Sequence, residues 1–266
     1  MDAQGYCAVE GGRLYYEVRG AGAPVVLLHS GLVDSRMWDA QMDAFAAKFR
    51  VFRYDLRGFG RSTPPTAPYS HVDDLDALFR HLRIDRAAAV GVSFGGRIAI
   101  DFTLEHPEKV RALVAVAAAA SGYNDWSPEL REAWSAMESA ILGGDIPRAQ
   151  KIEMDLWLPP GTFPESDAFI WKMAVENRKV FGVDPELERR LERPAFDRLP
   201  EIRAPTLVVL GERDLRDIEV IGEVLVQRIH GARKVVIPRT DHLVNVRNPE
   251  AFNRAVLEFL EGATSA

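Results

Sequence analysis

The stretch Gly91-Val92-Ser93-Phe94-Gly95 decides the fold, because it fits the pattern G-x-S-x-G and stands between a predicted strand and a predicted helix. The apolar run 87–90 leads into it, and the helix-like run 96–102 leads out of it. On such a sharp turn a serine presents its hydroxyl above the sheet in a strained backbone conformation. The helix behind it directs backbone N–H groups toward any oxyanion formed there. Ser93 is therefore the candidate nucleophile.

Strand and helix patterns alternate on both sides of this motif. Apolar-rich runs that predict strands lie at 25–28, 51–54, 111–116, 206–210 and 234–237. Helices are predicted at 35–49, 72–82, 218–229 and 249–260. An alternating segment at 6–18, with Gly11-Gly12 in its middle, predicts a β-hairpin. The alternation predicts an α/β fold with a mainly parallel sheet and helices on both faces.

The alternation stops between residues 121 and 193. Only interrupted helical stretches occur there, and four of the five tryptophans of the chain lie in this segment. We expect a core domain at 1–120 and 194–266 and a helical cap, or lid, at 121–193. Trp126, Trp134 and Trp157 are candidate substrate-binding residues, although each can equally serve to pack the cap on the core.

The composition limits the partners of the protein. The 266 residues carry a net charge of −6, which argues against a nucleic-acid or anionic-membrane partner. No apolar run reaches membrane-spanning length, and the first residues lack the features of an export signal. The single cysteine, Cys7, cannot form an internal disulfide, which fits a reducing cytoplasm. We expect a cytoplasmic protein that binds a small molecule, and the oligomeric state stays open.

A serine at its ordinary pKa needs a base within hydrogen-bond reach and a carboxylate that orients this base. His242 follows the last predicted strand, at the sheet edge where Ser93 also lies, and Asp214 follows another strand at the same edge. The order Ser93, Asp214, His242 is the order expected for a serine on this kind of turn. The alternatives for the acid are Asp217, Asp241 and, more distantly, Asp125.

The other five histidines are weaker candidates for the base. His29 ends another predicted strand, in the loop expected to shape the oxyanion hole. The remaining four lie within or at the ends of predicted helices and are expected at the surface or at element boundaries: His71, His81, His106 and His230.

The motif, the order of the three residues and two further segments together resemble the α/β-hydrolase fold superfamily over essentially the whole chain. The segments 53–62 and 242–252 are similar to those of the 3-oxoadipate enol-lactonase and small esterase branch. The resemblance implies an eight-stranded, mostly parallel sheet, a helical cap after the sixth strand and a serine mechanism without a cofactor. It places the oxyanion-hole N–H groups on Gly31 and Phe94, with Leu32 as a substitute for Gly31 and a further substrate-binding candidate.

The chain departs from the superfamily at one point of this loop, because Ser30 interrupts the common His-Gly start. Asp55, Arg57 and Ser62 match a loop of the family that is mainly structural, so we assign them no catalytic role.

Other chemistries lack the residues that they need. No phosphate-binding glycine motif follows a strand, and the histidines and acids show no metal-ligand spacing, so we expect no cofactor and no metal. Ser93 also argues against the dehalogenases and epoxide hydrolases of the superfamily, which carry an aspartate at this position. We expect a hydrolase of a carboxylic ester or lactone with substantial apolar surface. The alternatives are hydrolysis of a C–C bond in a β-diketone and a small-molecule sensor with little turnover.

Overall fold

Among residues 2–159 and 161–264, which this computed structural model describes, eight strands form one sheet in the order β1-β2-β4-β3-β5-β6-β7-β8. The β1–β2 and β2–β4 pairs are antiparallel and the remaining pairs are parallel. The strands are β1 (Ala3–Val9), β2 (Gly12–Arg19), β3 (Pro24–Leu28), β4 (Arg50–Tyr54), β5 (Ala87–Val92), β6 (Val110–Val116), β7 (Thr206–Gly211) and β8 (Arg233–Ile237). The predicted α/β class, the mostly parallel sheet and the N-terminal hairpin are thus confirmed.

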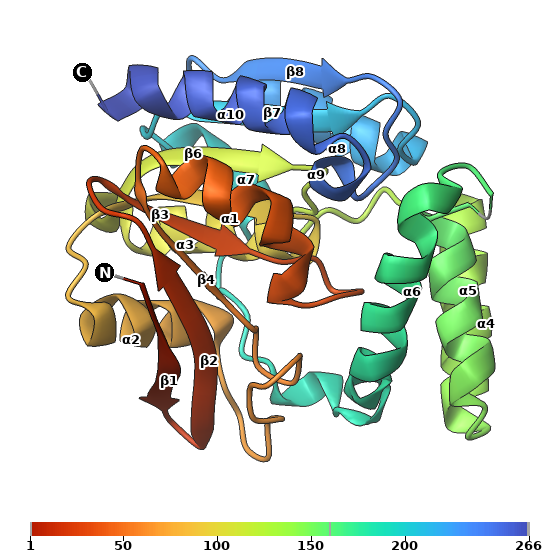
Figure 1. Cartoon of the computed structure of the whole chain (residues 1–266). Helices are drawn as coiled ribbons and strands as arrows, with labels where there is room; N and C mark the ends of the chain where they lie inside the picture. Colours follow the sequence, from red (N-terminus) through yellow and green to blue (C-terminus); the bar gives the residue numbers. More distant parts are fainter. Residues whose placement is uncertain (1, 160, 265–266) are drawn as a thin grey trace.

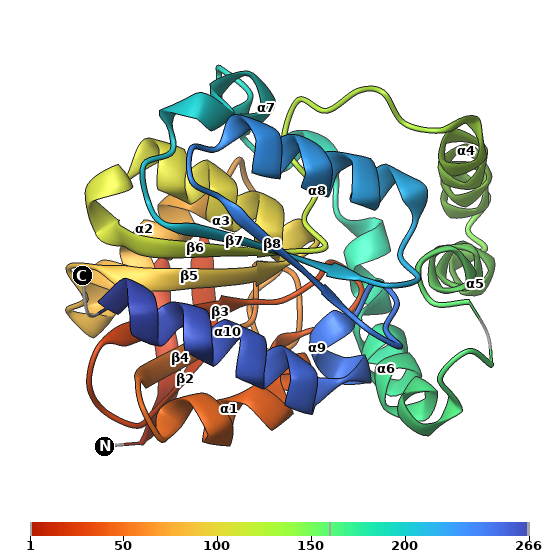
Figure 2. The same ribbon diagram turned by 90° about the horizontal axis from the view of Figure 1, so that it is seen from above.

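Helices cover both faces of the sheet. Figure 2 shows α2, α3 and α8 over one face and α1 and α10 over the other. Every residue of the central strand β5 is buried, as expected for a strand covered on both faces. The helices of this part are α1 (Asp39–Ala46), α2 (His71–Leu82), α3 (Phe94–Glu105), α7 (Ala195–Arg198), α8 (Arg216–Arg228), α9 (Val244–Arg247) and α10 (Pro249–Thr264), with 3₁₀ turns η1 (Ser35–Trp38), η2 (Pro107–Lys109) and η5 (Leu199–Glu201). None of the described helices combines the length and the hydrophobicity that a membrane span requires.

The segment between β6 and β7 forms a helical layer beside the sheet. In Figure 1 it lies beyond the carboxyl ends of the parallel strands, in the direction in which the arrows of β6 and β8 point. Ser127 caps α4 by accepting a hydrogen bond from the Leu130 N–H, and Asp145 caps α5 in the same way through Arg148. The elements are α4 (Pro128–Leu142), α5 (Ile146–Trp157), α6 (Pro164–Asn177), η3 (Arg178–Gly182) and η4 (Pro185–Leu187).

The helix predicted at 35–49 is divided. A buried 3₁₀ turn, η1, comes first, and the α-helix begins only at Asp39. The Asp34 side chain caps the 3₁₀ turn through the Arg36 N–H, while the Asp55 carboxylate accepts a hydrogen bond from the Ser35 N–H. These hydrogen bonds hold the first turn in place. The spacing of apolar residues does not reveal them, so the sequence predicts one continuous helix.

Candidate active site

The serine turn joins β5 to α3 and is strained. Ser93 has φ 55° and ψ −113°, a backbone conformation that non-glycine residues rarely adopt. The glycines on either side make it feasible: a Cβ on Gly91 would lie 2.2 Å from the carbonyl oxygen of Gly95, and one on Gly95 would lie 2.4 Å from that of Leu28. The Ser93 N–H donates to the Val116 carbonyl at 2.9 Å, which ties the turn to the neighbouring strand. Ser93 itself stays partly exposed.

A buried carboxylate and imidazole lie at the same edge of the sheet. Asp214 follows β7 and His242 follows β8, and the His242 Nδ1–H donates to Asp214 Oδ1 at 3.0 Å and Oδ2 at 3.2 Å. Their side chains are only 0% and 1% exposed, respectively. The other ring nitrogen, Nε2, is buried and has no hydrogen-bond partner among the described residues. An imidazole whose Nδ1–H is held by a carboxylate presents Nε2 as a proton acceptor.

The three alternative acids are engaged elsewhere or lie in solvent. Asp217 accepts a hydrogen bond from the Ser127 N–H at 2.6 Å, and Asp241 accepts from Arg247 Nε at 2.9 Å. Asp125 is exposed. Within the described residues, the hydrogen bonds join Asp214 rather than any of these three acids to His242.

One cap residue reaches the imidazole. Trp157, the last residue of α5, stacks on His242 with ring centroids 4.3 Å apart and an interplanar angle of 28°. Trp126 and Trp134 instead contact each other edge to face at 5.0 Å, and Trp126 also contacts Tyr123 at 4.7 Å. The structure therefore brings Trp157 to the candidate base, whereas the other two tryptophans form an aromatic cluster of the cap.

The two candidate oxyanion donors are neighbours. A Cβ on Gly31 would lie 3.5 Å from the Cβ of Phe94, and both residues are partly exposed. Phe94 is the first residue of α3, where backbone N–H groups lack intrahelical partners. Leu32, by contrast, is 6% exposed and belongs to the hydrophobic core.

Two further histidines are buried behind this site. His29 Nε2 accepts the Leu56 N–H at 2.9 Å while its Nδ1 lies 2.7 Å from the Ser30 carbonyl, and burial lowers its pKa. His71 packs edge to face against the Phe94 ring, with centroids 5.1 Å apart, and is 4% exposed. Burial, followed by the nearby arginine charges, holds its pKa well below the usual value. His71 is the first residue of α2, so the expected boundary position is correct, but the residue is buried and not at the surface, because it packs against Phe94 of α3 and this contact leaves no local sequence signal.

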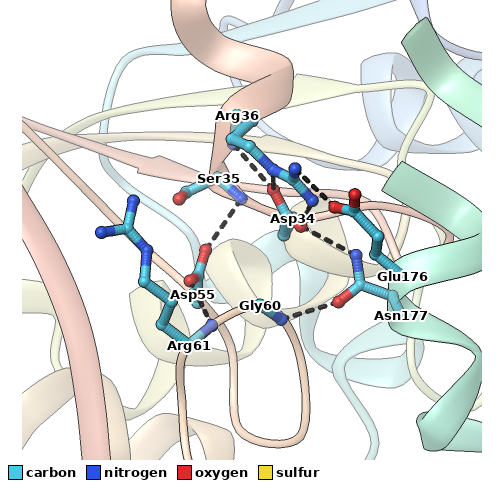
Figure 3. A pocket seen from close by; sticks show the side chains of 8 residues that line it. All are labelled: Asp34, Ser35, Arg36, Asp55, Gly60, Arg61, Glu176 and Asn177. Carbon is cyan, nitrogen blue, oxygen red and sulfur yellow. Dashed lines mark hydrogen bonds and ion pairs between the residues drawn. The ribbon is translucent and has the colours of Figure 1, made fainter. Parts of the chain in front are cut away.

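A polar pocket of about 240 Å³ lies between the cap and the core, and Ser93 is not among the residues that line it (Figure 3). Asn177, at the end of α6, accepts a hydrogen bond from the Gly60 N–H at 2.7 Å and donates to Asp34 Oδ2 at 2.8 Å. Arg36 pairs with both Asp34 and Glu176. Burial alone would raise the pKa of Asp34, but the hydrogen bonds from Arg36 and Asn177 lower it to about 2. These contacts anchor α6 to the loop that carries Gly31.

The loop after β4 supports the same region. The Asp55 carboxylate accepts the Ser35 and Arg61 N–H groups, as Figure 3 shows, and the Ser62 hydroxyl donates to the Asp55 carbonyl. Arg57 makes two hydrogen bonds to the buried Asp74 carboxylate, at 2.8 and 2.6 Å. All of these bonds hold backbone or other side chains in place, in keeping with a structural part for the loop.

The sheet order, the strained serine turn and the histidine–carboxylate pair are those of a hydrolase fold, and the chain belongs to the α/β-hydrolase fold family, whose sequence model matches residues 23–151. Among its relatives is the "Putative carbamate hydrolase RutD" of Rhizobium rhizogenes, 32% identical over 93% of this chain and 97% of that protein. The 3-oxoadipate enol-lactonase 2 of Acinetobacter baylyi is 28% identical over 89% and 88% of the two chains. The crystal structure of the enol-lactonase from Burkholderia xenovorans LB400 superposes with a TM-score of 0.82 at 26% identity, covering 97% of this chain and all of the other. The similarity to the enol-lactonase and esterase branch is thus confirmed.

Proposed function

We propose that this protein hydrolyses carboxylic esters or lactones, with Ser93 as nucleophile, His242 as general base and Asp214 as the group that orients the base. The observation that carries the proposal is the buried Asp214–His242 pair, whose Nε2 is left without a partner at the sheet edge of the strained Ser93 turn. A nucleophilic serine needs such a base and such an orienting carboxylate.

The reaction would run in two stages. Ser93 Oγ attacks the substrate carbonyl while its proton passes to His242 Nε2, and the N–H groups of Gly31 and Phe94 hold the oxyanion. The leaving alkoxide takes the proton from His242, and an acyl ester remains on Ser93. Water then attacks this ester, gives a proton to His242 and releases the acid, while the serine oxygen takes the proton back.

We assign the chemistry to the core, 1–120 and 194–266, and the choice of substrate to the cap, 121–193. The stacking of Trp157 on His242 supports this division, because it places an apolar cap surface directly over the candidate base. A large aromatic surface at this point favours a substrate with apolar character.

The relatives suggest a second candidate within the same chemistry. Relatives named as enol-lactonases support a lactone, whereas the carbamate hydrolase at 32% identity supports attack on a carbamate carbonyl. A serine nucleophile can attack the carbonyl of a lactone and that of a carbamate, so a panel of test substrates should contain compounds of both classes. A β-diketone in the panel tests the C–C hydrolase, and thermal stabilisation by a substrate that is not turned over tests the sensor.

The decisive experiment combines turnover with covalent labelling. We expect the wild-type protein to hydrolyse p-nitrophenyl esters, and Ser93→Ala to lower kcat by about 10³- to 10⁶-fold. A fluorophosphonate should label Ser93, as read by peptide mass spectrometry. Ser30→Ala is the matched control, since Ser30 also has a hydroxyl near this edge, buried and without a hydrogen-bond partner among the described residues. Activity of Ser93→Ala above a tenth of wild type, or labelling of another residue, would refute the assignment.

A further inference from the structure

The inward face of α5 carries polar side chains that the proposed mechanism does not use. Residues spaced three or four apart share one face of a helix, and on α5 this face contains Ala149, Gln150, Glu153, Met154 and Trp157. The structure buries three of them, Ala149, Gln150 and Met154, and stacks the last on His242. Glu153 therefore stands in the middle of the face that α5 turns toward the protein.

The Glu153 carboxylate has no hydrogen bond and no ion pair among the described residues. The acid two positions further along, Asp155, is different: it points to the other side of α5 and pairs with Lys151. Burial raises the pKa of Glu153 to about 7. The residue is nevertheless partly exposed. A polar group enclosed in this way without a partner is costly to the fold and calls for an explanation.

A second unsatisfied group lies beside it. Gln150 is 5% exposed, and its Nε2 has no hydrogen-bond partner in the part of the chain that the structure describes. At a rise of 1.5 Å per residue, Glu153 lies about 6 Å and Gln150 about 10 Å along the helix axis from Trp157. One face of α5 thus carries the aromatic ring that stacks on His242 and two polar groups without hydrogen-bond partners among the described residues, the Glu153 carboxylate and Gln150 Nε2.

We propose that Glu153 forms a polar subsite of the cap, whose carboxylate accepts from a hydrogen-bond donor, most strongly an ammonium group, at the end of the substrate distant from the reacting carbonyl, while Gln150 Nε2 beside it donates to the carboxylate or to an acceptor on the ligand. The subsite disfavours a substrate that carries a carboxylate there, because two like charges in a poorly solvated space repel each other. This inference rests on the proposed function, since the position of the subsite is counted from His242. It adds a substrate class: esters or lactones with a cationic or N–H-bearing end.

The test uses three p-nitrophenyl esters with six-carbon acyl chains that differ only at the far end: 6-aminohexanoyl, hexanoyl and adipyl monoester. At pH 8 the Glu153 carboxylate is mostly ionised. Glu153→Gln should then lower kcat/KM for the ammonium ester and raise it for the carboxylate ester, each by about tenfold, as for hydrogen bonds to charged groups. The hexanoyl ester should change less than threefold.

Asp155→Asn is the matched control, because it removes the same charge from the same helix but on the outer face. It should leave the order of the three esters unchanged. Competitive inhibition and thermal stabilisation by hexylamine and by hexanoate, on wild type and Glu153→Gln, extend the test to a ligand bound in either direction. Equal effects of Glu153→Gln on the cationic, neutral and anionic compounds in both measurements would overturn the subsite. Loss of the proposed function is seen separately, as absence of hexanoyl ester turnover by the wild type.

Discussion

Replacing Asp214 by asparagine tests the orienting acid with little change of shape. The carboxylate accepts the His242 Nδ1–H at 3.0 Å, and the Leu215 N–H at 2.8 Å holds the same carboxylate oxygen. An amide can turn an N–H toward Nδ1, which then accepts, so that the proton moves to Nε2 and blocks the base. The expected loss in kcat is on the order of 10⁴-fold. At about 1.36 kcal/mol per factor of ten this corresponds to about 5.4 kcal/mol of transition-state stabilisation.

Asp241, the residue before His242, should give the opposite result when it is replaced: a loss of stability with little loss of activity. Asp241 and Arg247 form a fully buried ion pair, so Asp241→Asn leaves the guanidinium short of a counter-charge. Breaking such a pair costs about 3–5 kcal/mol of folding free energy. We expect the lower end of this range, because Asp167 still contacts Arg247 at 2.7 Å. Asp241→Asn should therefore lose stability and keep most of its kcat, and Asp217→Asn should keep most of both.

The assay pairs p-nitrophenyl ester kinetics with urea unfolding of each variant, at a temperature where all of them are folded. Asp214→Asn is expected to lose activity with a nearly unchanged unfolding midpoint. Asp241→Asn is expected to unfold at a lower urea concentration and to keep most of its activity. A larger loss of kcat in Asp241→Asn or Asp217→Asn than in Asp214→Asn would refute the argument, because hydrogen-bond geometry would then have misidentified the acid.

Two further predictions concern the cap. Trp157→Ala should lower kcat/KM for bulky aromatic esters by an amount that corresponds to about 1–3 kcal/mol of binding free energy, because the ring gives apolar contact and little stabilisation of the developing charge. Acetate esters should keep their kcat, so kinetics on both ester series tests the prediction. The control Trp126→Ala removes a ring of the separate aromatic cluster and should lower the melting temperature and affect all substrates alike; the same uniform drop in Trp157→Ala would contradict a role in binding. Asn177→Ala should lower the free energy of unfolding, measured in urea, by about 1–3 kcal/mol. Asn177→Asp should lower it by more, because the new carboxylate would face the carboxylate of Asp34. Equal or smaller destabilisation by aspartate would show that the Asn177–Asp34 hydrogen bond does not hold the cap.

Much of the fold and of the candidate site could be predicted from the sequence, because both depend on local patterns. Apolar runs of four to six residues mark buried strands whatever their partners, and glycines at 91 and 95 indicate a turn in which a Cβ would clash. Since parallel strands end at one edge, residues that follow β5, β7 and β8 must gather there. Ser93, Asp214 and His242 are therefore predictable as one set from the sequence.

The tertiary structure alone decided which side chains meet at that edge. Asp214 and Asp241 both follow strands, and their partners differ because the loop after β8 turns the His242 imidazole toward Asp214, whereas Arg247 at the end of α9 pairs with Asp241. The orientation of the cap is likewise non-local: it depends on bonds such as that between Asn177 and Asp34, 143 positions apart in the chain. A helical pattern shows that Glu153 and Trp157 share a face of α5, but only packing determines what that face is turned toward. Residues that are neighbours in sequence determine the helix and strand patterns, whereas many contacts between residues distant in sequence together determine which side chains meet.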